Sequence, residues 1–264
     1  MKVFADGLLQ GKAALITGGG TGIGLATALE MGRLGAKVAI CSRKQEKIDK
    51  GAQALKAAGI DFHAGLCNVR ERAEVEKFVG EVLSRFGKID ILVNNAGGQF
   101  PSPAAPLQPK GWNAVVDTNL NGTWNMTQVV AQKSMLRTGG AIVNVILPME
   151  RAWPGVAHSG AARAAVANLT QSLAVEWAPF GIRVVAYGPG TIETEGIQQY
   201  PKPALDALKK RIPWGRTGRP EETAWAITFF ASPACDFLTG ETITMDGGAR
   251  LYSPDFPVRK IKEE

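Results

Sequence analysis

Three glycines near the amino terminus, Gly18, Gly22 and Gly24, have the spacing and position of a turn that could hold a phosphate. They follow an apolar run at 13–17 and open a stretch with helical periodicity at 23–34. Such glycines let the backbone approach a pyrophosphate and leave free N–H groups at a helix start. A structural turn is the alternative, since turns use glycine for positive φ angles. The spacing is GxxxGxG and not GxGxxG, but the position after the first predicted strand favours a dinucleotide site.

A hydroxyl and two cations, Ser42, Arg43 and Lys44, follow the second predicted strand at 38–41. Proteins that prefer NAD usually place a carboxylate here to accept hydrogen bonds from the ribose hydroxyls. Arg43 can instead form charge-assisted hydrogen bonds to a 2′-phosphate, with Ser42 and Lys44 assisting. The alternative is that Arg43 and Lys44 only begin a solvent-exposed helix. The absence of a carboxylate favours the first interpretation, and we expect NADPH as the cofactor.

The elements that must position these residues alternate along the chain. Apolar runs typical of strands lie at 13–17, 38–41, 89–94, 141–145, 183–187 and 241–245. Segments with helical periodicity lie at 23–34, 72–86, 112–135, 161–177 and 221–231. This alternation predicts a single Rossmann-like α/β domain with a doubly wound parallel sheet and helices on both faces. The irregular segment 191–219 is expected to form a lid over a substrate pocket.

The composition is that of one domain over residues 1–264, with 45% hydrophobic residues and no break that would divide the chain. An excess of 30 Lys and Arg over 24 Asp and Glu gives a net charge of +6. The basic residues are scattered and not interleaved with aromatics, which argues against nucleic-acid binding. The charge reflects either a solvated basic surface or a preference for polyanionic small molecules, such as a phosphorylated dinucleotide or a coenzyme A ester.

The three cysteines, Cys41, Cys67 and Cys235, have neither CxxC nor His-rich spacing, so the sequence predicts no disulfide framework and no metal site. No apolar run approaches the ~20 residues that are needed to cross a bilayer, and there is no apolar segment typical of a secretory signal. We therefore expect a soluble, cytoplasmic protein with no membrane partner.

Four motifs occur in the order and at the spacing of one known family. They are Thr17-Gly18-x-x-x-Gly22-x-Gly24, Asn94-Asn95-Ala96-Gly97, Asn119 in a helical segment, and Pro189-Gly190-x-Ile192-x-Thr194. The chain therefore resembles the short-chain dehydrogenase/reductase family over nearly its whole length. The resemblance implies a pyrophosphate site at the glycine turn, an adenosine side at Asn95 and Ala96, and a nicotinamide carboxamide site at 189–194. It also implies a homotetramer.

The resemblance and the cationic segment together predict a set of cofactor-binding residues. Asn68 stands where the family often has an Asp beside the adenine. The complete predicted set is Gly18, Thr21, Gly22, Ile23, Gly24, Ser42, Arg43, Lys44, Asn68, Val69, Asn95, Ala96, Gly97, Arg163, Pro189, Gly190, Ile192 and Thr194.

The resemblance breaks down at the family's catalytic groups. It places Ser159 where the family has its Tyr and Arg163 where it has its Lys. The family's Ser falls at Ile146 or Leu147, both apolar, so that Asn119 alone is retained.

Three local segments resemble one branch of the family. Residues 97–104, 157–164 and 168–170 are similar to the peroxisomal trans-2-enoyl-CoA reductases, with 2,4-dienoyl-CoA reductases as close relatives. The last residues, Lys262-Glu263-Glu264, differ from the peroxisomal address of that branch.

These substitutions favour one reaction over another. Ketone reduction leaves an alkoxide that needs a positioned acid. Hydride addition to an enoyl thioester instead leaves an enolate, which needs an oxyanion donor and then a proton. We expect Ser159 to donate to the thioester oxygen and Arg163, four residues later on the same helix face, to bind the nicotinamide ribose. His158 is a possible proton source, with a packing or capping role as the alternative.

The sequence thus predicts NADPH-dependent reduction of a C=C bond in enoyl-CoA or dienoyl-CoA thioesters, with Asn119, Ser159, Arg163 and His158 in the active site. Two alternatives stay open. One is a 3-oxoacyl or other carbonyl reductase, and the other is a family member that binds NADPH but has lost its chemistry.

Overall fold

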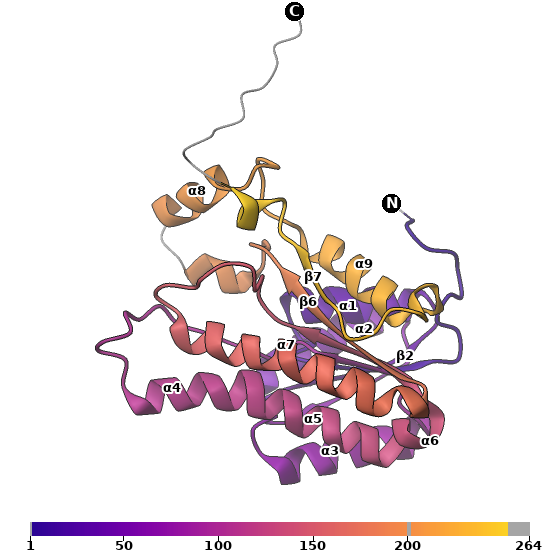
Figure 1. Cartoon of the computed structure of the whole chain (residues 1–264). Helices are drawn as coiled ribbons and strands as arrows, with labels where there is room; N and C mark the ends of the chain where they lie inside the picture. Colours follow the sequence, from indigo (N-terminus) through magenta and orange to yellow (C-terminus); the bar gives the residue numbers. More distant parts are fainter. Residues whose placement is uncertain (1, 200–201, 253–264) are drawn as a thin grey trace, which may run out of the picture.

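The computed structural model describes residues 2–199 and 202–252 of the chain. These residues form a domain built around one parallel sheet (Figure 1). Its strand order is β3-β2-β1-β4-β5-β6-β7. The strands are β1 (Ala13–Thr17), β2 (Lys37–Ser42), β3 (Phe62–Leu66), β4 (Ile91–Asn94), β5 (Gly140–Val145), β6 (Ile182–Pro189) and β7 (Thr242–Met245). The order changes direction between β1 and β4, and ligands of such sheets bind beyond the carboxyl ends of the strands at this point.

Helices cover both faces of the sheet, as Figure 1 shows. One face carries α1 (Gly22–Arg33), α2 (Gln45–Ala57) and α9 (Pro220–Ala231). The other carries α3 (Arg72–Phe86), α4 (Pro109–Val116), α5 (Gly122–Val130), α6 (Leu136–Thr138) and α7 (Ala157–Trp177). The remaining helix, α8 (Lys202–Lys210), lies near the end of β7. The predicted doubly wound α/β fold is confirmed.

The apolar runs become central strands because both of their faces are buried. In β1, Ile16 packs into the core beneath α1 and α9, whereas Leu15 packs into the core beneath α3, α5 and α7. Both side chains are fully buried. A strand with two buried faces has no polar alternation, which explains why the continuous apolar runs marked the strands correctly.

One strand lies outside the predicted ranges. The sequence of β3 is Phe-His-Ala-Gly-Leu, and this strand forms the edge of the sheet with partly exposed residues. An edge strand needs no continuous apolar run, so periodicity did not mark it. Helix α7 also begins at Ala157, before the predicted start at 161, so that His158 and Ser159 lie in its first turn.

The predicted helix at 112–135 is interrupted by two π-helical turns, Asp117–Asn121 and Ala131–Met135. The first contains Asn119, which is 2% exposed. The Asn119 side chain in this turn reaches the loop that follows β4. Single π-helical turns of this kind often occur at functional sites.

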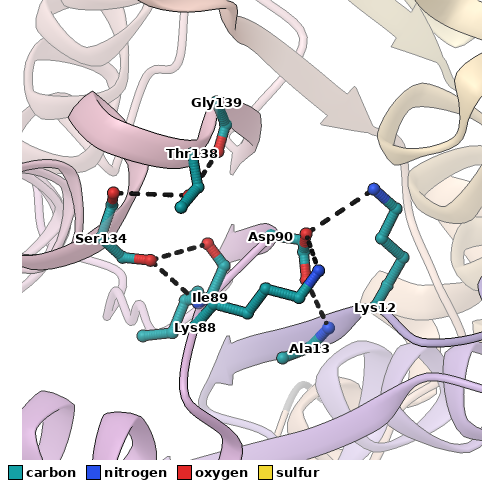
Figure 2. A network of polar contacts seen from close by, with 8 residues as sticks. All are labelled: Lys12, Ala13, Lys88, Ile89, Asp90, Ser134, Thr138 and Gly139. Atoms are coloured by element: carbon teal, nitrogen blue, oxygen red, sulfur yellow. Dashed lines mark hydrogen bonds and ion pairs between the residues drawn. The ribbon is translucent and has the colours of Figure 1, made fainter.

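At the opposite end of the sheet, Asp90 joins the starts of neighbouring strands (Figure 2). Its carboxylate accepts hydrogen bonds from the Ala13 N–H at 2.9 Å and from Lys88 Nζ at 2.9 Å. Lys12 Nζ lies 3.6 Å from the same side chain, and the Asp90 backbone bonds to Ala13 and Ala141. The Asp90 side chain is 10% exposed. Asp90 therefore ties the starts of three strands together, with its carboxylate at β1 and its backbone at β1 and β5, far from the carboxyl ends of the strands.

We expect Asp90→Ala to lower the free energy of unfolding by about 2–3 kcal/mol, because a nearly buried N–H and two cations lose a charged acceptor. Urea unfolding would measure the loss. Asp61→Ala is the matched control, since Asp61 pairs with Arg85 at 2.7 Å but both side chains are half exposed. The control should cost less than about 1 kcal/mol, and equal losses for both variants would contradict this role of Asp90.

Candidate active site

A cavity of about 420 Å³ opens where β1, β2 and β4 end. The strand register places these ends side by side, since Thr17 pairs with Cys41 and Ile16 pairs with Val93. Residues predicted to bind the cofactor that line it are Gly18, Thr21, Gly22, Ile23, Ser42, Arg43, Lys44, Val69, Asn95, Ala96, Gly97 and Thr194. Cys41, Lys47, Cys67, Thr118, Glu195 and Gly196 also line it but were not predicted.

The glycine turn is shaped by close packing against its surroundings. Gly18 and Gly22 have φ angles of +66° and +53°, which strongly favour glycine. A Cβ at Gly24 would collide with the Gly18 carbonyl, so Gly24 serves helix packing and does not line the cavity. The amino terminus of α1 therefore lies directly behind the turn, as the phosphate site requires.

Asn95 has a positioning role in this structure. Its Nδ2 donates to the Thr17 carbonyl at 2.9 Å, and its backbone N–H donates to Thr17 Oγ1 at 3.0 Å. The Ala96 N–H donates to the same hydroxyl at 2.8 Å. The turns after β1 and β4 are thus held together, which fixes the floor of the cavity.

The end of the cavity beside β2 is cationic. Arg43 and Lys44 are exposed side chains with no ion pair to another residue of the described part. Lys47, one turn later in α2, adds a third cation; its helical spacing after Lys44 is the signal that sequence reasoning missed. Glu195 is the acid among the described lining residues, and it is paired with Lys50. This end is suited to a phosphate and unsuited to a carboxylate-dependent ribose site.

Asn119 holds the loop that follows β4. Its Oδ1 accepts the Gly98 N–H at 3.0 Å, and its Nδ2 donates to the Gly98 carbonyl at 2.9 Å. Arg163 Nη2 lies 3.4 Å from Asn119 Oδ1. The carboxamide of Asn119 thus fixes the backbone of Gly98, next to the cavity-lining Gly97.

Arg163 reaches from α7 under the same loop. Its Nη1 donates to the carbonyl of Val145, the last residue of β5, and its Nε has no hydrogen-bond partner among the described residues. Burial lowers the pKa of Arg163 to about 10, so the group stays charged at neutral pH. Arg163 does not line the cavity described above. Its Nη2 lies next to Gly97, which does line the cavity, so the positive charge of Arg163 lies beside the cavity floor.

Ser159 and His158 are both fully buried in the first turn of α7. Ser159 Oγ donates to Gln99 Oε1 at 2.8 Å. The His158 ring packs edge-on against Phe100, with 4.7 Å between ring centroids, and neither ring nitrogen has a partner in the described ranges. Ile146, one of the two positions at which the family's Ser falls, is 2% exposed and apolar, and the other position, Leu147, is apolar as well. Gln99 is the functional candidate that sequence reasoning did not single out.

Several predicted residues lie away from the cavity. Asn68 Oδ1 accepts from Arg70 Nε at 3.2 Å and does not line the cavity. Pro189 ends β6 and is also outside it. Gly190 and Ile192 line a different hollow of about 420 Å³, together with Trp214, Trp225 and Met245 among others.

The predicted lid at 191–219 is partly helical. It contains a 3₁₀ segment, Glu195–Gln199, and the helix α8. Thr194, Glu195 and Gly196 border the cavity at the ends of β1, β2 and β4. Residues 200–201 of the predicted lid lie outside the described residues.

The described residues contain no group of three or more His, Cys, Asp or Glu side chains that could hold a metal ion. In the same part of the chain, no helix combines the length and the apolar character that crossing a membrane requires.

Two kinds of curated relatives are similar to this chain, and residues 18–250 match a family model described as Enoyl-(Acyl carrier protein) reductase. The peroxisomal 2,4-dienoyl-CoA reductase of Rattus norvegicus is 37% identical over 258 residues, which cover 96% of this chain and 88% of that protein. The 3-oxoacyl-[acyl-carrier-protein] reductase of Thermotoga maritima is 36% identical over 241 residues, covering 91% and 98%, respectively.

Solved structures show the same fold. A citronellol catabolism dehydrogenase of Pseudomonas aeruginosa has a TM-score of 0.86 and 40% identity, covering 94% of this chain and 99% of that one. A gluconate 5-dehydrogenase of Burkholderia cenocepacia, in complex with NADP and tartrate, has a TM-score of 0.87 and 37% identity, covering 93% and 97%. The similarity therefore extends across the sheet and both helical layers.

Proposed function

Because this chain belongs to the short-chain dehydrogenase/reductase family and is an oxidoreductase, we propose that it reduces the C=C bond of enoyl-CoA or 2,4-dienoyl-CoA thioesters with NADPH. The observation that carries the substrate proposal is the first part of α7. There, Ser159 is buried against Gln99, and Arg163 is tied to Val145 and Asn119. No phenol stands where a carbonyl reductase of this family needs its acid.

Tyr187 does not replace that phenol. It is fully buried in β6 and packs against Phe230 of α9, with 5.7 Å between ring centroids. This places it on the sheet face opposite α7. Burial raises the pKa of Tyr187 well above its ordinary range, so it is a poor acid as well as a distant one. Among the described residues, an alkoxide from a ketone would therefore lack the phenol that usually supplies its proton in this family.

Reduction of a conjugated thioester makes a smaller demand on the protein. When a hydride joins C3 of an enoyl thioester, or C5 of a 2,4-dienoyl thioester, the conjugated electron pairs move toward the thioester oxygen and form an enolate. The oxygen then needs a hydrogen-bond donor, and C2 needs one proton. We propose that water delivers that proton; His158 remains the predicted alternative donor, although its ring is fully buried against Phe100.

The residues around the cavity fit NADPH. The glycine turn and the start of α1 would hold the pyrophosphate, and Arg43, Lys44 and Lys47 would surround a 2′-phosphate. NADPH supplies the hydride when it is bound. We propose that Arg163 provides fixed positive charge beneath the nicotinamide ribose from its place beside the cavity floor.

Stopped-flow measurement of NADPH absorbance with crotonyl-CoA and longer enoyl-CoA or 2,4-dienoyl-CoA esters tests the proposal. We expect turnover with at least one of these esters. The absence of turnover across all chain lengths would overturn it. Acetoacetyl-CoA is the comparison substrate, because the Thermotoga maritima relative is named for a 3-oxoacyl substrate. Faster reduction of acetoacetyl-CoA would favour a carbonyl reductase, and NADPH binding without any turnover would favour a non-catalytic protein.

We further propose that the protein is a cytoplasmic homotetramer. Exposed apolar side chains on the α4 and α7 layer, which include Trp112, Val175 and Phe180, support burial by other subunits. Analytical ultracentrifugation at micromolar concentration should therefore show a tetramer. A stable monomer would contradict this assembly, and fractionation of cells would test the location.

A further inference from the structure

We infer that the side-chain amide of Gln99 is the hydrogen-bond donor to the substrate thioester oxygen, and that buried Ser159 positions this amide. The inference rests on the proposed function and names the group that stabilises the enolate. It also revises the expectation that Ser159 itself contacts the substrate.

The backbone next to Gln99 is held at Gly98, through both its N–H and its carbonyl. The N–H of Gly98, the preceding residue, donates a hydrogen bond to Asn119 Oδ1 at 3.0 Å, and the Gly98 carbonyl accepts one from Asn119 Nδ2 at 2.9 Å. Asn119 itself is 2% exposed. The loop after β4 therefore presents the Gln99 side chain from a fixed point beside the cofactor cavity, which Gly97 lines.

The orientation of the carboxamide follows from its partner. Ser159 Oγ donates to Gln99 Oε1 at 2.8 Å, so the oxygen of the carboxamide faces α7. In a planar carboxamide the NH₂ group lies on the other side, with two donors. Gln99 is half-buried, and its Nε2 donates to no other residue in the part of the chain that the structure describes. This leaves an oriented donor that faces away from the Ser159 hydroxyl and has no protein partner among the described residues.

Ser159 is poorly placed to act directly. It is fully buried, and its only proton is already given to Gln99. A substrate oxygen could reach Ser159 only if Gln99 moved away and left a buried hydroxyl without its acceptor. The geometry therefore assigns contact with substrate to Gln99 and positioning to Ser159.

A neutral amide donor also explains the reaction preference. It can stabilise negative charge on an enolate oxygen, but it cannot transfer a proton to an alkoxide, because a carboxamide is a very weak acid. Gln99, which is hydrogen-bonded to Ser159, can therefore support C=C reduction but cannot supply the acid that carbonyl reduction needs.

The test uses Gln99→Leu, Ser159→Ala and the double variant, with Gln53→Leu as the matched control because Gln53 is exposed on α2. Gln99→Leu should lower kcat for enoyl-CoA reduction about 10²–10³-fold. Ser159→Ala should lower it about tenfold, since one orienting hydrogen bond is lost. The double variant should match Gln99→Leu within about twofold, because the two residues act as one unit. NADPH affinity should stay near wild type throughout, whereas Gln99→Leu should lower Tm slightly because it leaves the buried Ser159 hydroxyl without its acceptor.

A second measurement is independent of turnover. The isotope-edited infrared spectrum of bound crotonyl-CoA, labelled at its carbonyl carbon, should show a lowered C=O frequency in the wild type that Gln99→Leu abolishes. If the wild type reduces enoyl-CoA while Gln99→Leu keeps both its rate and the lowered frequency, the inference is wrong and the proposed function stands. A larger loss from Ser159→Ala than from Gln99→Leu would make Ser159 the donor. A wild type without enoyl-CoA turnover would overturn the proposed function and this inference with it.

Discussion

Replacing Arg43 by glutamate is expected to raise the Kd for NADPH by about 100-fold or more, while the Kd for NADH changes little. Arg43 lines the cationic end of the cavity next to Ser42, Lys44 and Lys47. A charge-assisted hydrogen bond to a phosphate contributes roughly 1.5–3 kcal/mol, and a carboxylate in its place adds repulsion. NADH has no 2′-phosphate, so neither effect applies to it.

Fluorescence titration with both cofactors would measure these constants. Lys77→Glu is the matched control, because Lys77 is exposed on α3 and does not line the cavity. It changes the net charge by the same amount and should leave the ratio of the two constants unchanged. Equal weakening of NADPH and NADH by Arg43→Glu would show that Arg43 does not contact the phosphate.

The second large effect is expected from Gly97→Ala, which should lower kcat/KM for the reductase about 100-fold or more. A Cβ at Gly97 would collide with Arg163 Nη2 and would lie 2.8 Å from Asn119 Oδ1. The guanidinium has little freedom to retreat, since it is also bonded to the Val145 carbonyl. Accommodation of the methyl group must therefore displace Arg163, Asn119 or the loop that carries Gln99.

Gly98→Ala is a closely matched control, because a Cβ at Gly98 would meet nothing within 4 Å. Both variants add one methyl group to adjacent residues of the same loop. Steady-state kinetics and thermal unfolding should show a strong loss for the first and near-normal behaviour for the second. Similar kinetics in the two variants would mean that the contact beneath Gly97 does not hold the site in its active geometry.

The sequence by itself was sufficient for the fold and for many of the residues that line the cavity at the ends of β1, β2 and β4. The buried strand β1, the glycine turn after it and the cations after β2 belong to one β-α-β unit, so the order of its elements already determines their relative places. The strand β3 escaped prediction because an edge strand with His63 and Gly65 lacks the apolar continuity of a central one.

The partners of the altered catalytic residues were decided only by the tertiary structure. Ser159 meets Gln99, sixty positions earlier, and Arg163 meets Val145 and Asn119 from two other elements. Neither periodicity nor motif spacing encodes such contacts, because they depend on how α7, the end of β5 and the loop after β4 pack together. The sequence predicted that the family's Tyr is replaced at position 159, and only the packing of these three elements shows that Gln99 lies against that position.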